Sequence, residues 1–368
     1  MPPSDTRSRL RTWFASTGRP PQTTLVAYLL CGAAVGAALG VAFDPRKGAA
    51  LAALTGSIVA AAGSRGPSRI ALRVAGFTAV MAVVFVFVAF LVGGHPWWAA
   101  AAVAVVAIAT SALNGGGPVG AALASLGLLI YVLAVVIGTV ADLNESISLV
   151  SGVVRILLGA AAGLAVAAVG SRLRDRRDRA GAAAAPRLPT PWPALWRSLR
   201  SFDEHVRDGV RRAIPLAVGI FLFERSGSRD SLWIFIAAFV VLMPAGKAPL
   251  DVAATKVAST IVGVVLLGLF ALVLPNSALL SIALVALLVG ILYSPTYPLV
   301  AGGLTAMGAI LLVGAPSGSI GEWAGHRLLD TVIGCTLALG STYLLWPRDK
   351  PDVEDSGGAS GRDTPNVS

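Results

Sequence analysis

The chain alternates between long apolar runs and short polar gaps. A helix that crosses the hydrocarbon of a bilayer needs about 20 mostly apolar residues, because only helical hydrogen bonds satisfy the backbone there. The pattern therefore predicts an all-α, polytopic membrane protein with about twelve transmembrane helices. The predicted spans are 24–43, 48–63, 70–93, 97–113, 119–141 and 153–169 before a polar linker, and 213–223, 232–243, 257–274, 277–293, 299–313 and 328–346 after it.

Two of the predicted spans, 213–223 and 232–243, are shorter than a bilayer requires. A re-entrant hairpin is the alternative to two full spans at this point of the chain. Either arrangement leaves both termini on the same side of the membrane, because a re-entrant hairpin removes two membrane crossings at once.

Composition agrees with a membrane protein and excludes other classes. Hydrophobic residues make up 55% of the chain and charged residues 13%, with a mean hydropathy of +0.77. The net charge of +10 comes from arginines in the gaps between apolar runs, where membrane topology explains them, so we expect no nucleic-acid partner. Cys31 and Cys335 lie in apolar runs without a second ligand, so we expect no disulfide, metal or cofactor.

Lysine and arginine predict the orientation, since they concentrate in cytoplasmic segments. They gather in the N-terminal tail, before Ile70, in the linker, around 247–256 and in the C-terminal tail. We therefore expect a multi-pass protein of the cell membrane with both termini cytoplasmic and an uncleaved first helix. The expected divisions are a tail at 1–23, a membrane unit at 24–170, a basic linker at 171–210, a second membrane unit at 211–347 and a disordered tail at 348–368.

The linker contains a predicted amphipathic helix. Its apolar residues recur at helical spacing with arginines between them: Leu195, Leu199, Phe202, Val206 and Val210. Such a helix would lie in the membrane interface. A solvated linker whose arginines only enforce topology explains the same charges.

The two membrane units resemble each other. A basic residue is followed seven positions later by glycine in Arg69 to Gly76, Lys256 to Gly263 and Arg327 to Gly334, and Arg155 precedes Gly159 and Gly163. Because each unit has six predicted spans, both units would have the same orientation in the membrane. The pattern thus predicts two parallel six-helix repeats related by an axis along the membrane normal.

The second unit resembles a known family. The features that carry the resemblance are Arg211-Arg212 before a short apolar helix, Trp233 opening the next span, Pro244 ending it, Lys256 with Gly263, Thr305, and the stretch from Arg327 to Gly334 continuing to Leu345-Trp346-Pro347. In this order they are similar to the fusaric-acid-resistance (FUSC-like) or aromatic acid exporter family, over about 211–347. The resemblance implies a proton-motive exporter of small organic anions, such as aromatic carboxylic acids or fusaric-acid-like compounds.

An exported anion needs cationic groups along its path, and charges within a span are costly unless they face a cavity or a partner. Arg155 and Arg327 begin corresponding spans, so we expect them to contact the substrate, and the resemblance adds Thr305. The alternative role for both arginines is structural: contact with the outer headgroups or an ion pair, which for Arg327 would be with Asp330.

Proton coupling needs an acid whose protonation changes within the membrane. Asp330 is our candidate, with Glu322, His326 and Glu224 as alternatives near the outer surface. On the inner side, Arg69, Arg73 and Lys256 could attract anions to a cytoplasmic entry. The general preference for basic residues on the cytoplasmic side explains them without any transport role and is the favoured explanation.

Other function classes fit the sequence less well. An integral-membrane enzyme would need clustered acids or histidines at a membrane face, and the three histidines are scattered. We therefore expect no enzymatic activity and an exporter whose partners are the lipid bilayer, a small organic anion, protons and possibly further copies of the chain. A non-transporting scaffold or accessory subunit of an envelope complex is the alternative.

Overall fold

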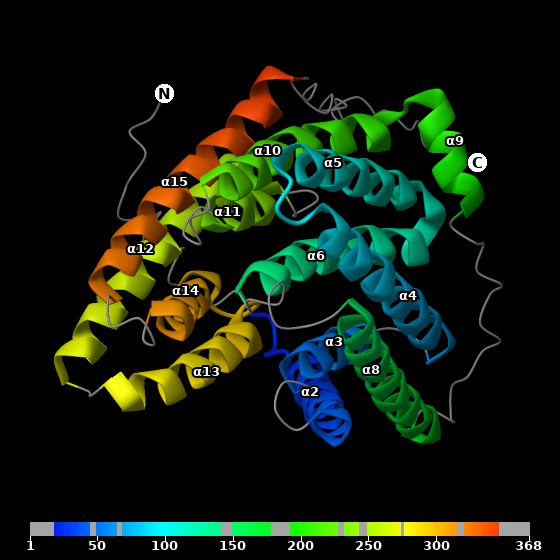
Figure 1. Cartoon of the computed structure of the whole chain (residues 1–368), viewed down its shortest axis with the longest axis horizontal. Coiled ribbons are helices and arrows are strands. Elements are labelled where there is room, and N and C mark those ends of the chain that lie inside the picture. Colours follow the sequence, from blue (N-terminus) through cyan, green and yellow to red (C-terminus); the bar gives the residue numbers. More distant parts are fainter. Residues whose placement is uncertain are drawn as a thin grey trace, which may run out of the picture.

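A computed structural model describes residues 18–44, 49–64, 68–140, 149–177, 192–226, 232–242, 249–273, 276–314 and 320–345 (Figure 1). These residues form helices and turns without a strand, which confirms the all-α class. The predicted disordered tail at 348–368 lies outside the described residues, as do most of the N-terminal tail and the centre of the linker.

The helices follow the predicted segments in order. Before the linker they are α2 (Thr23–Phe43), α3 (Ala49–Ala62), α4 (Ser68–Val92), α5 (Pro96–Ala112), the short 3-10 helix η1 (Leu113–Gly116), α6 (Gly117–Val140) and α8 (Leu149–Arg177). From the linker onward they are α9 (Trp192–Ser201), α10 (Glu204–Ser226), α11 (Leu232–Leu242), α12 (Pro249–Val273), α13 (Asn276–Tyr293), α14 (Pro298–Gly314) and α15 (Ile320–Leu344).

Among the described residues, five helical stretches are long and apolar enough to cross a membrane: Thr23–Phe43, Ser68–Val92, Pro96–Gly116, Val150–Arg176 and Pro249–Phe270. Shorter apolar stretches lie in α3, α6, α11, α13 and α14. The chain is therefore a membrane protein with several apolar helices. The number of twelve spans stays a prediction.

Three helices begin earlier than the hydropathy pattern predicts, which changes the place of key residues. The short segment 213–223 belongs to the second half of α10, whose first turns are polar but bury one face against the protein, at Val206, Gly209 and Arg212. α12 begins at Pro249, so Lys256 lies about two turns inside a helix and not in a gap. α15 begins at Ile320, which puts Arg327 at a similar depth in its helix.

The same pairs of helices contact each other in both halves of the chain. Before the linker, α2 contacts α3, α8 contacts α2, α3 and α4, and α4 contacts α6. After it, α10 contacts α11, α15 contacts α10, α11 and α12, and α12 contacts α14. Between the halves, α5 packs against α10, and α13 contacts α2. Figure 1 shows the helices α2, α3, α4 and α8 on one side of the molecule and α12 to α15 on the other.

Glycine allows the closest helix contacts. A Cβ atom at Gly36 of α2 would collide with the backbone of Ala52 in α3, and one at Gly159 of α8 would collide with the same carbonyl oxygen. In the second half, Gly334 of α15 lies equally close to the backbone of α11 at Ile234. The last helix of each half thus packs through glycine against the second helix of that half.

The predicted amphipathic helix of the linker is divided in two. Phe202 has a left-handed φ of 48° and separates α9 from α10. Asp203 caps α10, because its Oδ1 accepts hydrogen bonds from the N–H groups of His205 (3.1 Å) and Val206 (3.2 Å). Slight burial acts to raise the pKa of Asp203, but hydrogen bonds from the Ser198 side chain and from these N–H groups outweigh it and hold the pKa below its usual value.

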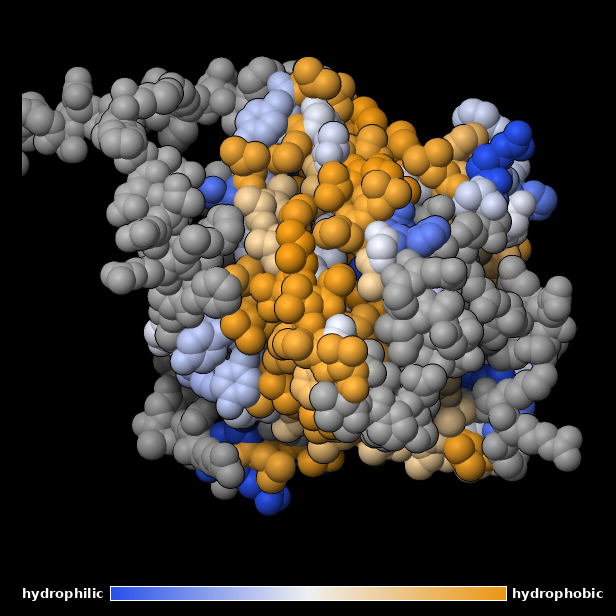
Figure 2. All heavy atoms as spheres, turned by 90° about the vertical axis from the view of Figure 1, so that its left-hand side faces the viewer, coloured by the Kyte–Doolittle hydropathy of each residue, from blue (hydrophilic) through white to orange (hydrophobic). Residues whose placement is uncertain are grey.

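The solvent-accessible surface of the second half is apolar along α12 and α15. Large hydrophobic side chains stand exposed along α12 and α15, among them Ile261, Val265, Leu269, Leu329 and Val332. Figure 2 shows a continuous hydrophobic band on this side of the molecule, with hydrophilic residues toward its edges. A surface of this kind suits lipid, as a membrane protein requires.

Candidate functional site

A cavity of about 400 Å³ lies between α11, α12 and α14. Its lining combines one cation, one carboxylate, several hydroxyls and apolar side chains: Val240, Asp251, Val252, Thr255, Lys256, Ser259, Pro298, Gly302 and Thr305. These residues come from the end of α11 and from the first turns of α12 and α14. All three of these helix ends are on the predicted cytoplasmic side, so the cavity would open toward the cytoplasm.

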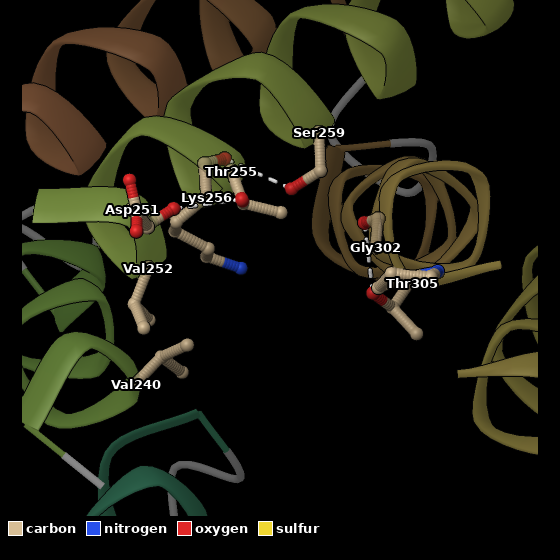
Figure 3. Close-up of a pocket in the computed structure, with 9 residues that line it drawn as sticks. Val240, Asp251, Val252, Thr255, Lys256, Ser259, Gly302 and Thr305 are labelled. Atoms are coloured by element: carbon tan, nitrogen blue, oxygen red, sulfur yellow. Dashed lines mark hydrogen bonds between the residues drawn. The ribbon is translucent and has the colours of Figure 1, made fainter. Parts of the chain in front are cut away.

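Lys256 is the cation of this cavity. It is partly buried, and Figure 3 shows its ammonium group pointing into the space in front of α14, where Thr305 lies. The structure therefore brings together two predicted site residues that are 49 positions apart in the chain. The sequence assigned them to different sites, Lys256 to a cytoplasmic entry and Thr305 to substrate binding.

Hydroxyl groups surround the ammonium group. Thr255 donates a hydrogen bond to the carbonyl oxygen of Asp251 (2.7 Å), Ser259 to that of Lys256 (2.9 Å) and Thr305 to that of Gly302 (2.8 Å). These bonds stay within the helices, so each hydroxyl can rotate toward a ligand without breaking a helix–helix contact. One cation with adaptable donors in a partly apolar cavity is suited to a small anion.

Arg327 lies deep in the same half of the molecule. Only 4% of its surface is exposed, and its guanidinium group stacks on the ring of Trp233 in α11, 3.3 Å from the ring centroid. Its charge interacts with those of Asp330, one turn later, and Lys256 in α12. Lys256 and Arg327 are thus two cationic groups within electrostatic reach of each other inside the second half.

Arg155, the predicted counterpart of Arg327, has a different environment. It is 2% exposed, and its Nη2 forms an ion pair with Asp44 at the end of α2. In the part of the chain that the structure describes, its Nε and Nη1 have no hydrogen-bond partner. The pair is the structural alternative that the sequence left open for this residue. Substrate contact at Arg155 stays a prediction.

Arg69 and Arg73 are exposed on α4 and do not line the cavity that holds Lys256. Arg69 lies in the first turn of α4, whereas Lys256 lies about two turns inside α12. The structure therefore separates the three residues that the sequence grouped as a cytoplasmic entry.

The candidate acids also differ in burial. Asp330 is 7% exposed within α15, while His326 on the same helix is exposed. Glu224 lies at the end of α10, where its Oε2 accepts a hydrogen bond from the N–H of Gly94 (3.1 Å). The side chain of Glu322 lies outside the described residues. Asp330 is thus the most buried of the acids whose surroundings the structure describes.

Part of the cavity lining was not among the predicted site residues. Thr255 and Ser259 line it beside Lys256, and Asp251 completes a row of polar residues spaced by four along α12. That spacing places the three residues on one helix face. A search for polar residues at this spacing would have found them, but the hydropathy pattern placed the start of the helix after Lys256.

Among the described residues, no group of three or more histidine, cysteine, aspartate or glutamate side chains could hold a metal ion. The cavity lining consists of a cation, a carboxylate, hydroxyls and apolar groups. Such a lining can bind a small polar molecule.

The fold and the cavity define a helical membrane protein with a small internal site. Residues 216–340 match the family model of the fusaric acid resistance protein-like proteins, which confirms the resemblance predicted for this part of the chain and indicates a transporter-like function. The matched stretch includes Trp233, Lys256, Thr305, Arg327 and Asp330. It does not include the first half of the chain. No curated protein and no solved structure matches the chain.

Proposed function

We propose that this protein is a secondary exporter of small organic anions, such as aromatic carboxylic acids or fusaric-acid-like compounds. The observation that carries the proposal is the cavity at the predicted cytoplasmic ends of α11, α12 and α14, with the Lys256 ammonium group directed into it. A cation in a low-dielectric surrounding attracts an anion more strongly than it would in water. The substrate carboxylate would bind at Lys256.

The size and lining of the cavity suit a small aromatic acid. Its volume of about 400 Å³ lies in the range of small-molecule sites, roughly 300–1,000 Å³. Val240 and Val252 offer apolar contact for a ring, while the Thr255, Ser259 and Thr305 hydroxyls can bind the carboxylate.

The route outward would pass from Lys256 toward Arg327. Charged side chains in a membrane interior usually face a partner or a substrate path. Lys256 and Arg327 are close enough for their like charges to repel each other. Within the described residues, the Nε of Arg327 has no hydrogen-bond partner. An anion between the two cations would relieve their repulsion. Asp330, beside Arg327, is the proposed group that exchanges protons with the energy source.

The proposed architecture is two parallel six-helix repeats. The shared helix contacts of the two halves support it, and so do the contacts between halves, where the fourth helix of each half meets the first helix of the other: α5 with α10, and α13 with α2. The site in the second half would then be one of two related positions. In the first half, the equivalent arginine, Arg155, forms an ion pair with Asp44.

Transport by inverted membrane vesicles tests the proposal. Vesicles that contain the full chain are prepared with an acidic lumen and are then given radiolabelled benzoate. Uptake is compared with that of vesicles lacking the protein. We expect gradient-dependent uptake by the wild type and at least about tenfold less by Lys256→Gln, because a charge-assisted contact of roughly 1.5–3 kcal/mol is lost.

Arg172→Gln is the matched control, since it removes one positive charge from the same predicted side of the membrane, at an exposed position of α8 outside the cavity lining. Equal uptake by both variants and the wild type would remove Lys256 from the site. If the wild type never exceeds empty vesicles for aromatic or aliphatic acids, the exporter proposal fails, and a scaffold or accessory subunit without enzymatic activity takes its place.

A further inference from the structure

One exposed stripe of α4 changes from apolar to cationic at its predicted cytoplasmic end. Val80, Val84 and Leu91 stand 62%, 49% and 58% exposed along this stripe, as the lipid-facing side of a membrane helix would. Arg69 and Arg73 continue it at the same helical spacing, and both are exposed. The two guanidinium groups therefore lie on the exposed side of α4 where its apolar stripe ends, at the predicted cytoplasmic end of the helix.

The helix α9 lies beside this cationic end. Trp192 packs edge-to-face against Phe77, which is one turn beyond Arg73 on α4, with the ring centroids 6.3 Å apart. Leu195 packs against the apolar cluster that includes Val74 and Leu113, so one side of α9 is held by the bundle. The contact with Phe77 places the arginines of α4 within about two helical turns of the tryptophan.

The rest of α9 is divided between an apolar and a basic side. Trp192 is 50% exposed and Trp196 is 61% exposed, one turn apart on the same face. Arg197 and Arg200 are exposed on the remaining side, away from Leu195. Helices with this distribution lie in the membrane interface, with tryptophan at the level of the headgroups and arginine toward water.

We propose that the α4–α9 corner, defined by Arg69, Arg73, Phe77, Trp192 and Trp196, binds the headgroup of an anionic phospholipid in the cytoplasmic leaflet. Guanidinium groups bind phosphate oxygens through paired hydrogen bonds, and Arg69 and Arg73 are one turn apart, so both can reach one phosphate. The tryptophan rings would cover the upper part of the acyl chains. The corner is separate from the cavity at Lys256, so the inference is independent of the exporter proposal.

Native mass spectrometry of the full chain in neutral detergent tests this inference. The probes are phosphatidylglycerol and phosphatidylcholine with identical acyl chains, and the readout is the apparent Kd for the first bound lipid. We expect the wild type to bind phosphatidylglycerol more tightly than phosphatidylcholine. The double variant Arg69→Gln/Arg73→Gln should weaken phosphatidylglycerol binding about thirtyfold and phosphatidylcholine binding by a smaller factor, because the choline group already neutralises the phosphate of that lipid.

The double variant Arg172→Gln/Arg176→Gln is the matched control. It removes the same charge from two exposed arginines at the same spacing near the end of α8, on the same predicted side of the membrane. Thermal unfolding in phosphatidylcholine shows that each variant is folded. Trp192→Leu, which keeps both arginines, should weaken phosphatidylglycerol binding by a smaller factor than the arginine variant.

Four results would overturn the inference. One is equal affinity of the wild type for the two lipids, and another is unchanged phosphatidylglycerol binding in Arg69→Gln/Arg73→Gln. The third is an equal loss in Arg172→Gln/Arg176→Gln, which would mean that total charge and not this corner decides binding. Displacement of the lipid by an equal concentration of inorganic phosphate would likewise exclude a lipid site, because the acyl chains would then contribute nothing.

Discussion

Two buried arginines in corresponding helices have different partners. Arg155 is held by the carboxylate of Asp44, at the end of the first helix of its half. The acid at the end of the first helix of the second half, Glu224, instead accepts a hydrogen bond from Gly94, while Arg327 stacks on Trp233. A direct ion pair neutralises Arg155, whereas the guanidinium group of Arg327 lies on an aromatic face with the charge of Asp330 one turn away on the same helix. The difference favours Arg327 over Arg155 as a substrate contact.

The ion pair of Arg155 should be important for stability. Asp44→Asn leaves a buried guanidinium group without its carboxylate, and we expect a loss of about 2–3 kcal/mol in the free energy of unfolding. Denaturant unfolding in detergent measures it, with Asp44→Glu expected to recover most of the loss. Asp175→Asn, at an exposed position of α8, should change stability by less than about 0.5 kcal/mol. Equal effects of the two asparagine variants would contradict a structural ion pair.

Stacking should make arginine specifically necessary at position 327. Arg327→Lys keeps the charge but loses the planar group that lies on Trp233. We expect about 1 kcal/mol weaker substrate binding, or roughly a fivefold higher KM for benzoate in the vesicle assay. Arg225→Lys, at the exposed end of α10, should leave KM unchanged. An unchanged KM in Arg327→Lys would show that only the charge matters.

At the scale of helices, close backbone contact decides which elements pack. A hydropathy pattern gives every apolar helix a similar driving force for membrane insertion, but helices approach closely only where small residues face each other. Gly32 of α2, Gly56 of α3 and Gly163 of α8 meet in this way. The first half is thus held together around α3, beside the ion pair of Arg155.

Gly56→Ala should disturb this packing. The added Cβ would collide with the carbonyl oxygen of Gly32 and lie 3.2 Å from that of Gly159, so α2 or α8 must move. We expect a loss of about 1–3 kcal/mol in the free energy of unfolding. Gly76→Ala on α4 is the control, because nothing lies within 4 Å of its Cβ position and alanine favours helix. A Gly56→Ala protein as stable as Gly76→Ala would mean that these helices separate without cost.

At the scale of the whole molecule, the contacts between halves are reciprocal. The turn region η1 after α5 lies against α9, just before α10, with Gly115 close to Ser198 and His205. On the other side, Thr296 after α13 donates a hydrogen bond to the carbonyl oxygen of Arg19 (2.8 Å), just before α2. The same part of each half thus meets the start of the other, as a twofold axis along the membrane normal would require.

The proposed orientation predicts where inserted reporters will work. A fluorescent protein inserted after position 185, in the linker, should fluoresce, because it stays in the cytoplasm. Alkaline phosphatase inserted after position 145, between α6 and α8, should be active, because that segment is predicted to face outward. Exchanging the two reporters should abolish both signals. Fluorescence at both positions would overturn the predicted number of spans in the first half.

The sequence alone determined the class of the protein, the order of its helices and most of its candidate residues. Apolar runs report membrane helices directly, since burial in hydrocarbon depends on composition more than on partners. The same reasoning misplaced the start of α12, because Asp251, Thr255 and Lys256 are polar and yet lie in a helix whose inner face borders a cavity. Hydropathy cannot distinguish a polar gap from a polar face.

Which charges meet depends on how the helices pack. Asp44 and Arg155 are 111 positions apart, and Lys256 and Thr305 come from helices separated by a third, α13. Their approach depends on helix packing through glycine and on reciprocal contacts between the halves, which spacing along the chain does not encode. Whether an arginine is paired, stacked or exposed on the surface therefore depends on its neighbours, and this distinction separates Arg155, Arg327 and Arg73 in this protein.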